Sequence, residues 1–204
     1  MYFDWTILLM LPGLLLGLWA QARVNSAYAK YSQVGTRSGV SAETAVSQLL
    51  RQNGAGDVAI QPVAGELTDH FDPSSNTLRL SRGVYASSSV AALGIAAHEA
   101  GHAVQYAVGY SPIKLRTAII PVTQIGSTLS WPLLLIGLVL GSETLAMAGV
   151  LLFCAVVVFQ LVTLPVEFNA SRRAMQAIES GNLLTEEEQR GARKTLKAAA
   201  LTYV

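Results

Sequence analysis

Three long runs without a charged residue set the strongest limit on how this chain of 204 residues can fold. They cover residues 5–22, 117–142 and 144–166, and each meets or approaches the roughly 20 apolar residues that a membrane-spanning helix needs. Hydrophobic residues make up 51% of the chain and charged residues 13%, which is too apolar for an ordinary soluble domain. The three runs therefore predict three transmembrane helices.

The first run has an alternative interpretation as a cleaved secretory signal, because Ala20-Gln21-Ala22 is similar to a cleavage site. The residues before the run include Asp4 and no basic residue, whereas signal peptides begin basic. We therefore interpret residues 5–22 as an uncleaved anchor. At the other end, residues 197–204 turn apolar again, which is typical either of a truncated further span or of the end of an amphipathic helix.

Basic residues next to the three runs predict the orientation in the membrane. Topology places six of them on one side: Arg23, Lys30, Lys114, Arg116, Arg172 and Arg173. The turn at residues 141–143, between the second and third runs, has no basic residue. By the positive-inside rule, the N-terminus lies outside and residues 23–116 and 167–204 are cytoplasmic. The pattern predicts a multi-pass protein of the cell membrane (inner or plasma membrane).

The stretch His98-Glu99-Ala100-Gly101-His102 contains two of the three histidines and forms the motif HExxH. Residues four apart on a helix lie on one face, so both imidazoles can bind one metal ion, with Glu99 beside them. This arrangement predicts a zinc hydrolase site in which Glu99 is the general base for a zinc-activated water. A pair of structural helix histidines is the alternative, but the surrounding residues are small and apolar and offer few partners.

Catalytic zinc usually has three protein ligands, so the motif needs one more. A metzincin would have a histidine at position 108, where this chain has Val108, and that class is excluded. Glu167 directly follows the third run, and the predicted hairpin of the second and third spans returns the chain to the membrane face of the motif. Glu167 is the preferred third ligand, and His70 remains a rival ligand or a substrate-binding or structural group.

The region between the first two spans has an α+β pattern. Ser41 and Gly54 delimit a helix at residues 42–52, residues 58–63 suggest a strand, and Ser87 to Ser89 begin the motif helix at about 88–108. The alternation after the turn at residues 72–76 predicts a strand at 77–81. We expect this strand to be a sheet edge that pairs with an extended substrate, and its candidate substrate-binding residues are Thr77, Leu78, Arg79 and Leu80, with His70.

These segments together resemble the YugP-like neutral zinc metallopeptidases of bacterial membranes. The resemblance rests on Trp19-Ala20-Gln21, on residues 67–73 and 78–81, on residues 97–103 and on residues 165–171. It implies a peptidase with His98 and His102 as zinc ligands, Glu99 as the catalyst and Glu167 as the third ligand. The wider HtpX-type peptidases often have an aspartate four residues after the ligand glutamate, where this chain has Ser171, so Asn169 or Ser171 is expected to orient the ligands instead.

The fold class that follows is a mainly α integral membrane protein, in which a small α+β zincin-like catalytic domain at residues 23–116 joins a transmembrane helix bundle. The predicted function is zinc-dependent hydrolysis of peptide bonds in membrane-associated or misfolded proteins. Oxyanion candidates are Arg172, Arg173, Tyr106 and His70. Alternatives are a site-2-type intramembrane protease, although no aspartate follows Asp72, and a non-hydrolytic zinc-stabilised scaffold.

The composition supports neither a nucleic-acid partner nor a disulfide-stabilised fold. A net charge of +1, without basic runs that alternate with aromatic residues, gives no reason to expect a nucleic-acid partner. Cys154 is the only cysteine and lies in an apolar run, so no intrachain disulfide can form. The expected partners are a peptide or protein substrate and the lipid bilayer.

Overall fold

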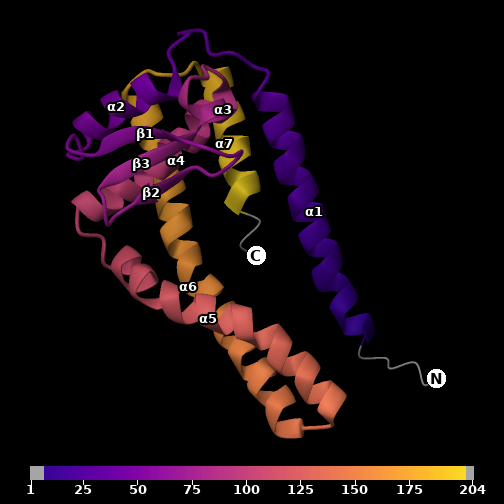
Figure 1. Ribbon diagram of the computed structural model, residues 1–204. Coiled ribbons are helices and arrows are strands. Elements are labelled where there is room, and N and C mark those ends of the chain that lie inside the picture. The colour runs from indigo at the N-terminus through magenta and orange to yellow at the C-terminus, as the bar shows by residue number, and fades with distance from the viewer. Residues whose placement is uncertain (1–6, 201–204) are drawn as a thin grey trace. The chain divides into compact units, whose positions relative to one another are not determined.

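The computed structural model describes residues 7–200 and is mainly helical, with a small three-stranded sheet (Figure 1). The chain divides into two compact units, which are described separately. Unit 1 comprises residues 1–108 and 168–204, and unit 2 comprises residues 109–167. The boundary between residues 167 and 168 falls inside one unbroken helix, α6 (Glu143–Ser180).

Unit 1 contains the sheet and most of the helices. Its helices, besides the last part of α6, are α1 (Ile7–Tyr31), α2 (Ala42–Gln52), α3 (Arg82–Tyr85), α4 (Val90–Ala107) and α7 (Glu186–Ala200). Its strands are β1 (Ala59–Val63), β2 (His70–Asp72) and β3 (Thr77–Ser81). The mainly helical α+β character expected from the sequence is therefore confirmed.

Local capping signals explain where α2 and α4 begin. The Ser41 side chain accepts a hydrogen bond from the Thr44 N–H at the start of α2, and Ser89 accepts one from the Ala92 N–H at the start of α4. Each serine satisfies a backbone donor that has no partner within the helix. The predicted helix at 42–52 and the predicted motif helix are confirmed.

The sheet has the order β1-β3-β2, with β1 parallel and β2 antiparallel to the central strand β3. The expectation that residues 77–81 form a sheet edge is therefore wrong. Strand β3 pairs on both sides, so its backbone is already engaged, and its side chains are mostly buried. The sequence pattern identified a strand, but the position of a strand in a sheet depends on its partners. The edge strands are β1 and β2.

The core of unit 1 surrounds α4. Most of this helix is buried, including Leu93, Ala96 and Ala100. Buried side chains from α2, β3, the end of α6 and α7 complete the same cluster, among them Leu49, Leu78, Ile178 and Leu196. The helix that carries the HExxH motif is thus held from several sides by protein, which fixes its side chains in place.

Unit 2 is a helical hairpin of α5 (Ser111–Leu140) and the first part of α6. Gly141, at φ 64°, ends α5, and α6 begins two residues later, as the predicted turn at 141–143 requires. The two helices pack closely: a Cβ at Gly149 would lie 2.6 Å from the Leu134 backbone nitrogen. Small residues at such contacts are typical of helix packing in membranes.

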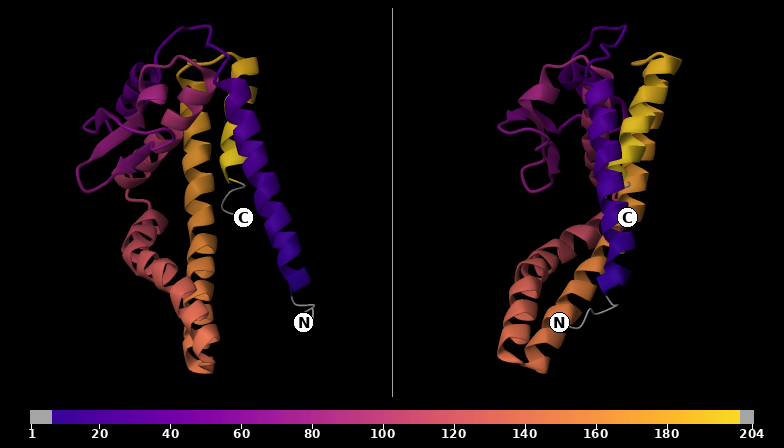
Figure 2. Two further views of the ribbon diagram at one scale, coloured as in Figure 1. Left: turned by 45° about the vertical axis from the view of Figure 1, so that its right-hand side comes forward. Right: turned by 90° about the vertical axis from the view of Figure 1, so that its right-hand side faces the viewer.

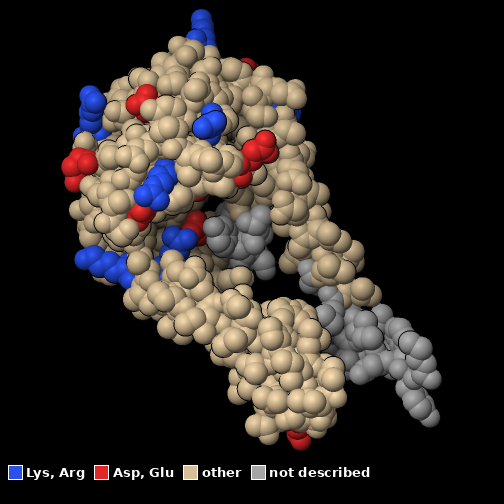
Figure 3. Space-filling model, viewed as in Figure 1, with Lys and Arg blue, Asp and Glu red and all other residues tan. Residues whose placement is uncertain are grey.

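The outer surface of the hairpin is apolar. Large side chains such as Val139, Leu151 and Val158 are exposed, and Figure 3 shows this surface nearly without charge. In the described part of the chain, α5 and α6 are the two helices long and apolar enough to cross a membrane. Helix α5 contains residues 117–140 of the span predicted at 117–142 and begins six residues before it, and α6 contains the whole predicted span at 144–166 and continues to Ser180.

The remaining predicted segments are only partly described. The first predicted span begins at residue 5, outside the described residues, and its described part belongs to α1, which continues to Tyr31. At the other end, Thr185 and Glu188 form a reciprocal capping pair at the start of α7. Residues 197–200 of the apolar C-terminal run belong to α7, and the rest of this run lies outside the described residues.

Candidate metal centre

Helix α4 presents the HExxH residues on one face. The rings of His98 and His102 have centroids 4.8 Å apart and stand edge to face at 83°. His102 is buried, whereas His98 and Glu99 are half-buried. This is the arrangement expected for residues at positions i and i+4 of a helix, so the sequence spacing alone determines it.

Glu167 completes a group of three metal-ligating side chains. One potential ligand atom from each of His98, His102 and Glu167 lies within 4.8 Å of the other two. Glu167 precedes Phe168, where α6 enters unit 1, and its side chain is 2% exposed. The third histidine, His70, does not belong to this group.

Gly101 explains how α6 comes so close to the motif. A Cβ at this position would lie 2.6 Å from the carbonyl oxygen of Ala170, a distance that real Cβ atoms essentially never show. The glycine between Glu99 and His102 therefore has a packing role. It lets the α6 backbone lie directly against α4, one turn after Glu167.

Both histidines are held through their Nδ1 atoms. His98 Nδ1 forms a 3.1 Å hydrogen bond with the Ser171 hydroxyl. His102 Nδ1–H donates to Gln105 Oε1 at 3.0 Å, because an amide oxygen can only accept. Nε2 is then the ring atom of each histidine that can face a metal, and such outer contacts fix the ring orientation of metal ligands.

The His102 contact extends into a chain of polar groups on α4 and α6. Gln105 is fully buried, and its Nε2 donates to Asn169 Oδ1 at 3.0 Å. Arg173 Nε donates to the same oxygen at 2.8 Å. Two donors on Oδ1 fix the Asn169 amide, which in turn directs the Gln105 oxygen toward His102. The sequence left Asn169 and Ser171 as alternatives for orienting the ligands. In the structure Ser171 contacts His98 directly, and Asn169 reaches His102 through Gln105.

Sequence reasoning missed two residues of this site. Gln105 lies three positions after His102, so a polar residue on the motif face of the helix was the available signal. Arg116 was interpreted only as a membrane-flanking cation. Within unit 2, its guanidinium forms an ion pair with Glu167 Oε1 at 3.1 Å. This contact links distant positions, and no sequence pattern indicates it.

The donor set fits a zinc ion. Two imidazole nitrogens and one carboxylate oxygen are the ligands of many catalytic zinc sites, and they leave a coordination position for water or substrate. The buried Glu167 carboxylate has positive charge beside it from the Arg116 guanidinium, so the assignment of zinc rests on the donor set itself. His98, His102 and Glu167 could therefore hold the ion, with outer contacts from Ser171 and Gln105.

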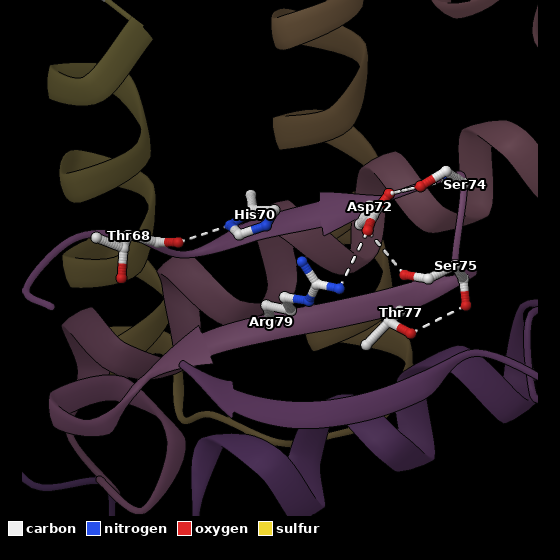
Figure 4. A network of polar contacts seen from close by, with 7 residues as sticks. All are labelled: Thr68, His70, Asp72, Ser74, Ser75, Thr77 and Arg79. Atoms are coloured by element: carbon white, nitrogen blue, oxygen red, sulfur yellow. Dashed lines mark hydrogen bonds and ion pairs between the residues drawn. The ribbon is translucent and has the colours of Figure 1, made fainter. Parts of the chain in front are cut away.

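The candidate substrate-binding residues lie on β2 and β3, and Figure 4 shows the polar contacts of His70, Thr77 and Arg79 among them. His70 Nδ1–H donates to the Thr68 carbonyl oxygen at 2.7 Å, and Arg79 forms a 3.2 Å ion pair with Asp72. Asp72 also accepts hydrogen bonds from Ser74 and Ser75. These hydrogen bonds, with a smaller contribution from the Arg79 guanidinium, hold the pKa of the Asp72 carboxyl well below its usual range.

The outcome for these candidates is mixed. Leu78 and Leu80 are fully buried core residues, Thr77 is also buried, and Arg79 holds the β2–β3 turn through Asp72. Only His70 lies on an edge strand and is exposed. The neighbouring Phe71 contacts Tyr106 of α4, with ring centroids 5.5 Å apart. Strand β2 is therefore the edge that adjoins the motif helix.

Comparison with known proteins decides the family. A family model described as "Putative neutral zinc metallopeptidase" matches residues 6–204. The chain belongs to this zinc metallopeptidase family. It is also similar to the "Putative membrane protease YugP" of Bacillus subtilis (strain 168), with 46% identity over 198 residues, which cover 97% of this chain and 88% of that protein. No solved structure matches the chain.

Membership of the zinc metallopeptidase family confirms the resemblance that the sequence motifs indicated. It also agrees with the chemistry of the donor set, since the family is named for zinc and the group of His98, His102 and Glu167 could hold that ion.

Proposed function

We propose that this chain is a membrane-anchored zinc endopeptidase in which His98, His102 and Glu167 bind the metal and Glu99 is the catalytic base. The observation that carries the proposal is the grouping of three metal-ligating atoms within 4.8 Å, next to the glutamate of the HExxH motif. Two of the three residues come from one helix turn and the third from a helix 65 positions later. Family membership supports the same reaction class.

The chemistry is hydrolysis of a peptide bond. Bound zinc supplies a Lewis acid that polarises the scissile carbonyl and makes a neighbouring water more acidic. The Glu99 carboxylate takes a proton from the attacking water while the water oxygen bonds to the carbonyl carbon. Glu99 then delivers this proton to the amide nitrogen as the C–N bond breaks, which releases a carboxyl and an amine product. Ser171 and Gln105 keep the two imidazoles oriented throughout.

Substrate recognition is assigned to the outer edge of β2. An extended peptide can pair with an edge strand through main-chain hydrogen bonds, so recognition depends little on sequence. Strand β2 is short, lies at the sheet edge and adjoins α4 through the contact of Phe71 with Tyr106. His70 on this strand, and Tyr106, are the side chains proposed to stabilise the oxyanion. Arg173 suits this role less because it already donates to Asn169.

The proposed location is the cell membrane, with α5 and α6 as spans and the catalytic residues on the cytoplasmic side. The apolar hairpin surface supports membrane insertion, and the basic residues that flank the uncharged runs support the orientation. Substrates would then be membrane-associated or misfolded proteins that reach this side of the bilayer. The name of the relative from Bacillus subtilis, a membrane protease, agrees with this location.

The intramembrane alternative has less support. Helix α4 packs in one unit with a sheet whose edges are open, and open sheet edges do not occur in the hydrocarbon of a bilayer. The motif is therefore assigned to the aqueous side of the membrane. The scaffold alternative differs from the proposal only in catalysis, so a variant at Glu99 separates the two.

The decisive experiment uses the purified full chain and its Glu99→Gln variant. The amide keeps the shape of the side chain but lacks the basic carboxylate. We expect the variant to retain one zinc per chain and the thermal stability of the wild type, while casein cleavage falls by at least about 100-fold. Cleavage at the wild-type rate, with zinc bound, would contradict the proposed role of Glu99 and support the scaffold alternative.

A further inference from the structure

Helices α1, α6 and α7 of unit 1 line an open cavity to which the proposed reaction assigns no ligand. Its volume is about 540 Å³, and its described lining includes Arg23, Arg172, Arg193 and Lys197. The apolar Met175 and Leu196, both buried, lie among these cations. Figure 2 shows α7 alongside α1, which agrees with the lining residues that these helices contribute.

A second cavity of about 390 Å³ adjoins the first, since both are lined by Arg23 and Lys197. It adds Lys30 and Lys194, and none of the described residues that line either cavity is acidic. Arg193 has a partner outside the lining, in a 2.6 Å ion pair with Glu179. The remaining cations make the two cavities strongly positive, and an anionic ligand is the chemical complement.

The surface of α1 indicates which kind of anion. Leu11, Leu14, Leu15 and Leu18 are exposed, and they lead along the helix to Trp19, whose ring lies 5.2 Å from the Arg23 guanidinium carbon. At about 1.5 Å per residue, Leu11 lies about 18 Å along the axis from Arg23. One leaflet of a bilayer has a hydrocarbon thickness of about 15 Å, half of the whole core. Tryptophan also favours the interface between the apolar and polar layers.

We propose that these two adjoining cavities bind the phosphate headgroup of an anionic phospholipid, with its acyl chains along the exposed leucines of α1. Cations lie at the end of the apolar surface of α1, just as the phosphate of a phospholipid lies at the end of its acyl chains. The protein surface and the lipid therefore have the same order of charged and apolar parts. A free phosphate would satisfy the cations but not the apolar surface beside them. The inference rests on the membrane association in the proposed function, but it does not depend on peptide cleavage.

Ser171 connects the cavity to the candidate metal centre. Ser171 lines the cavity and also contacts His98 Nδ1 at 3.1 Å, and Arg172 is the next residue on the same turn of α6. A headgroup phosphate bound to Arg172 would therefore contact the same turn of α6 whose Ser171 orients His98, a proposed zinc ligand. We expect the occupied site to hold this turn in place and to favour the metal-binding arrangement of His98.

The test measures lipids that remain bound to the purified full chain in native mass spectrometry, after incubation with equal amounts of phosphatidylglycerol and phosphatidylcholine. The wild type should retain phosphatidylglycerol selectively. The double variant Arg172→Gln/Lys197→Gln should lose about 25-fold in affinity, since each membrane-apposed cation contributes about fivefold. The matched control Arg51→Gln/Arg82→Gln removes two exposed cations of unit 1 outside the cavities and should bind like the wild type.

Equal losses in both double variants, or unchanged binding in Arg172→Gln/Lys197→Gln, would contradict the lipid site. Displacement of the lipid by millimolar inorganic phosphate would also contradict it and would indicate a site for free anions. Displacement by an acidic peptide, without any lipid selectivity, would assign the cavity to substrate instead. Casein cleavage by the Glu99→Gln variant is independent of all these readings, so failure of the lipid site and failure of the peptidase assignment are distinguishable.

Discussion

Helix α4 of unit 1 and helix α5 of unit 2 are similarly apolar, but they use this property in opposite ways. Most of α4 is buried by the protein around it, whereas only four residues of α5 are buried: Ile113, Gly126, Ser130 and Gly137. The exposed apolar surface of α5 is the kind that lipid can cover, and the buried surface of α4 is a protein core. Hydropathy alone does not distinguish a core helix from a lipid-facing helix, because it carries no information about which segments pack against the helix.

The largest expected effect tests the third proposed ligand of the metal-binding motif on the buried helix α4. Glu167→Ala removes one of three proposed ligands and should weaken zinc binding by more than the 10–100-fold typical of an outer partner. His70→Ala should leave zinc affinity unchanged, because His70 lies outside the ligand group. Competition with a metal chelator measures both. Zinc loss in His70→Ala, with zinc retained in Glu167→Ala, would instead identify His70 as the third ligand and contradict the assignment of Glu167.

A matched pair of lysine substitutions tests the comparison directly. Val46 in α2 is 1% exposed, and Val46→Lys should destabilise unit 1 by about 3–5 kcal/mol, because it buries an unpaired charge. Val158 in α6 is 59% exposed, and Val158→Lys should oppose membrane insertion by about 3 kcal/mol while zinc binding by the solubilised protein is kept.

The readouts for this pair are thermal unfolding of the purified protein and the fraction that resists alkaline extraction from membranes. If Val158→Lys remained fully inserted and Val46→Lys left the unfolding temperature unchanged, the proposed contrast between a lipid-facing and a core surface would be lost.

Two glycines of α4 allow a finer test of how closely its neighbours approach. Gly101→Ala places a Cβ against the Ala170 carbonyl and should cost about 1–3 kcal/mol, with weaker zinc binding. Gly94→Ala brings its Cβ only to 3.6 Å from the Ala192 Cβ, an ordinary contact, and should be neutral or stabilise the helix by up to about 1 kcal/mol. Calorimetry and chelator competition compare the variants, and equal effects at the two positions would argue against close α4–α6 packing.

The smallest expected effect concerns Asp72 at the β2–β3 turn. Because the folded-state pKa of this carboxyl is lowered, its hydrogen bonds stabilise the fold above the unfolded-state pKa and are lost as the pH falls through the acidic range. Asp72→Asn should therefore reduce the loss of thermal stability between pH 7 and pH 3. Melting curves at the two pH values test this, and an identical pH dependence in both proteins would contradict it.

Much of this site follows from local patterns. Spacing on one helix places His98 and His102 together, and serine N-caps define where α2 and α4 begin before any tertiary contact is known. The turn at 141–143 returns the chain to the membrane face of the motif, and this topology predicted Glu167 as the third ligand. By contrast, the strand at 77–81 was recognised but its place in the sheet was wrong, because strand order depends on pairing with β1 and β2.

What the sequence by itself determined is the chemistry: a metal-binding motif on a helix, a candidate third ligand and uncharged segments suited to a membrane. Only the tertiary structure decided which neighbours serve that chemistry. Gln105 beside His102, Arg116 beside Glu167 and the close approach at Gly101 all depend on which helices pack together. The physical reason is that backbone geometry fixes the position of residues a few places apart, whereas contacts between distant segments arise from packing.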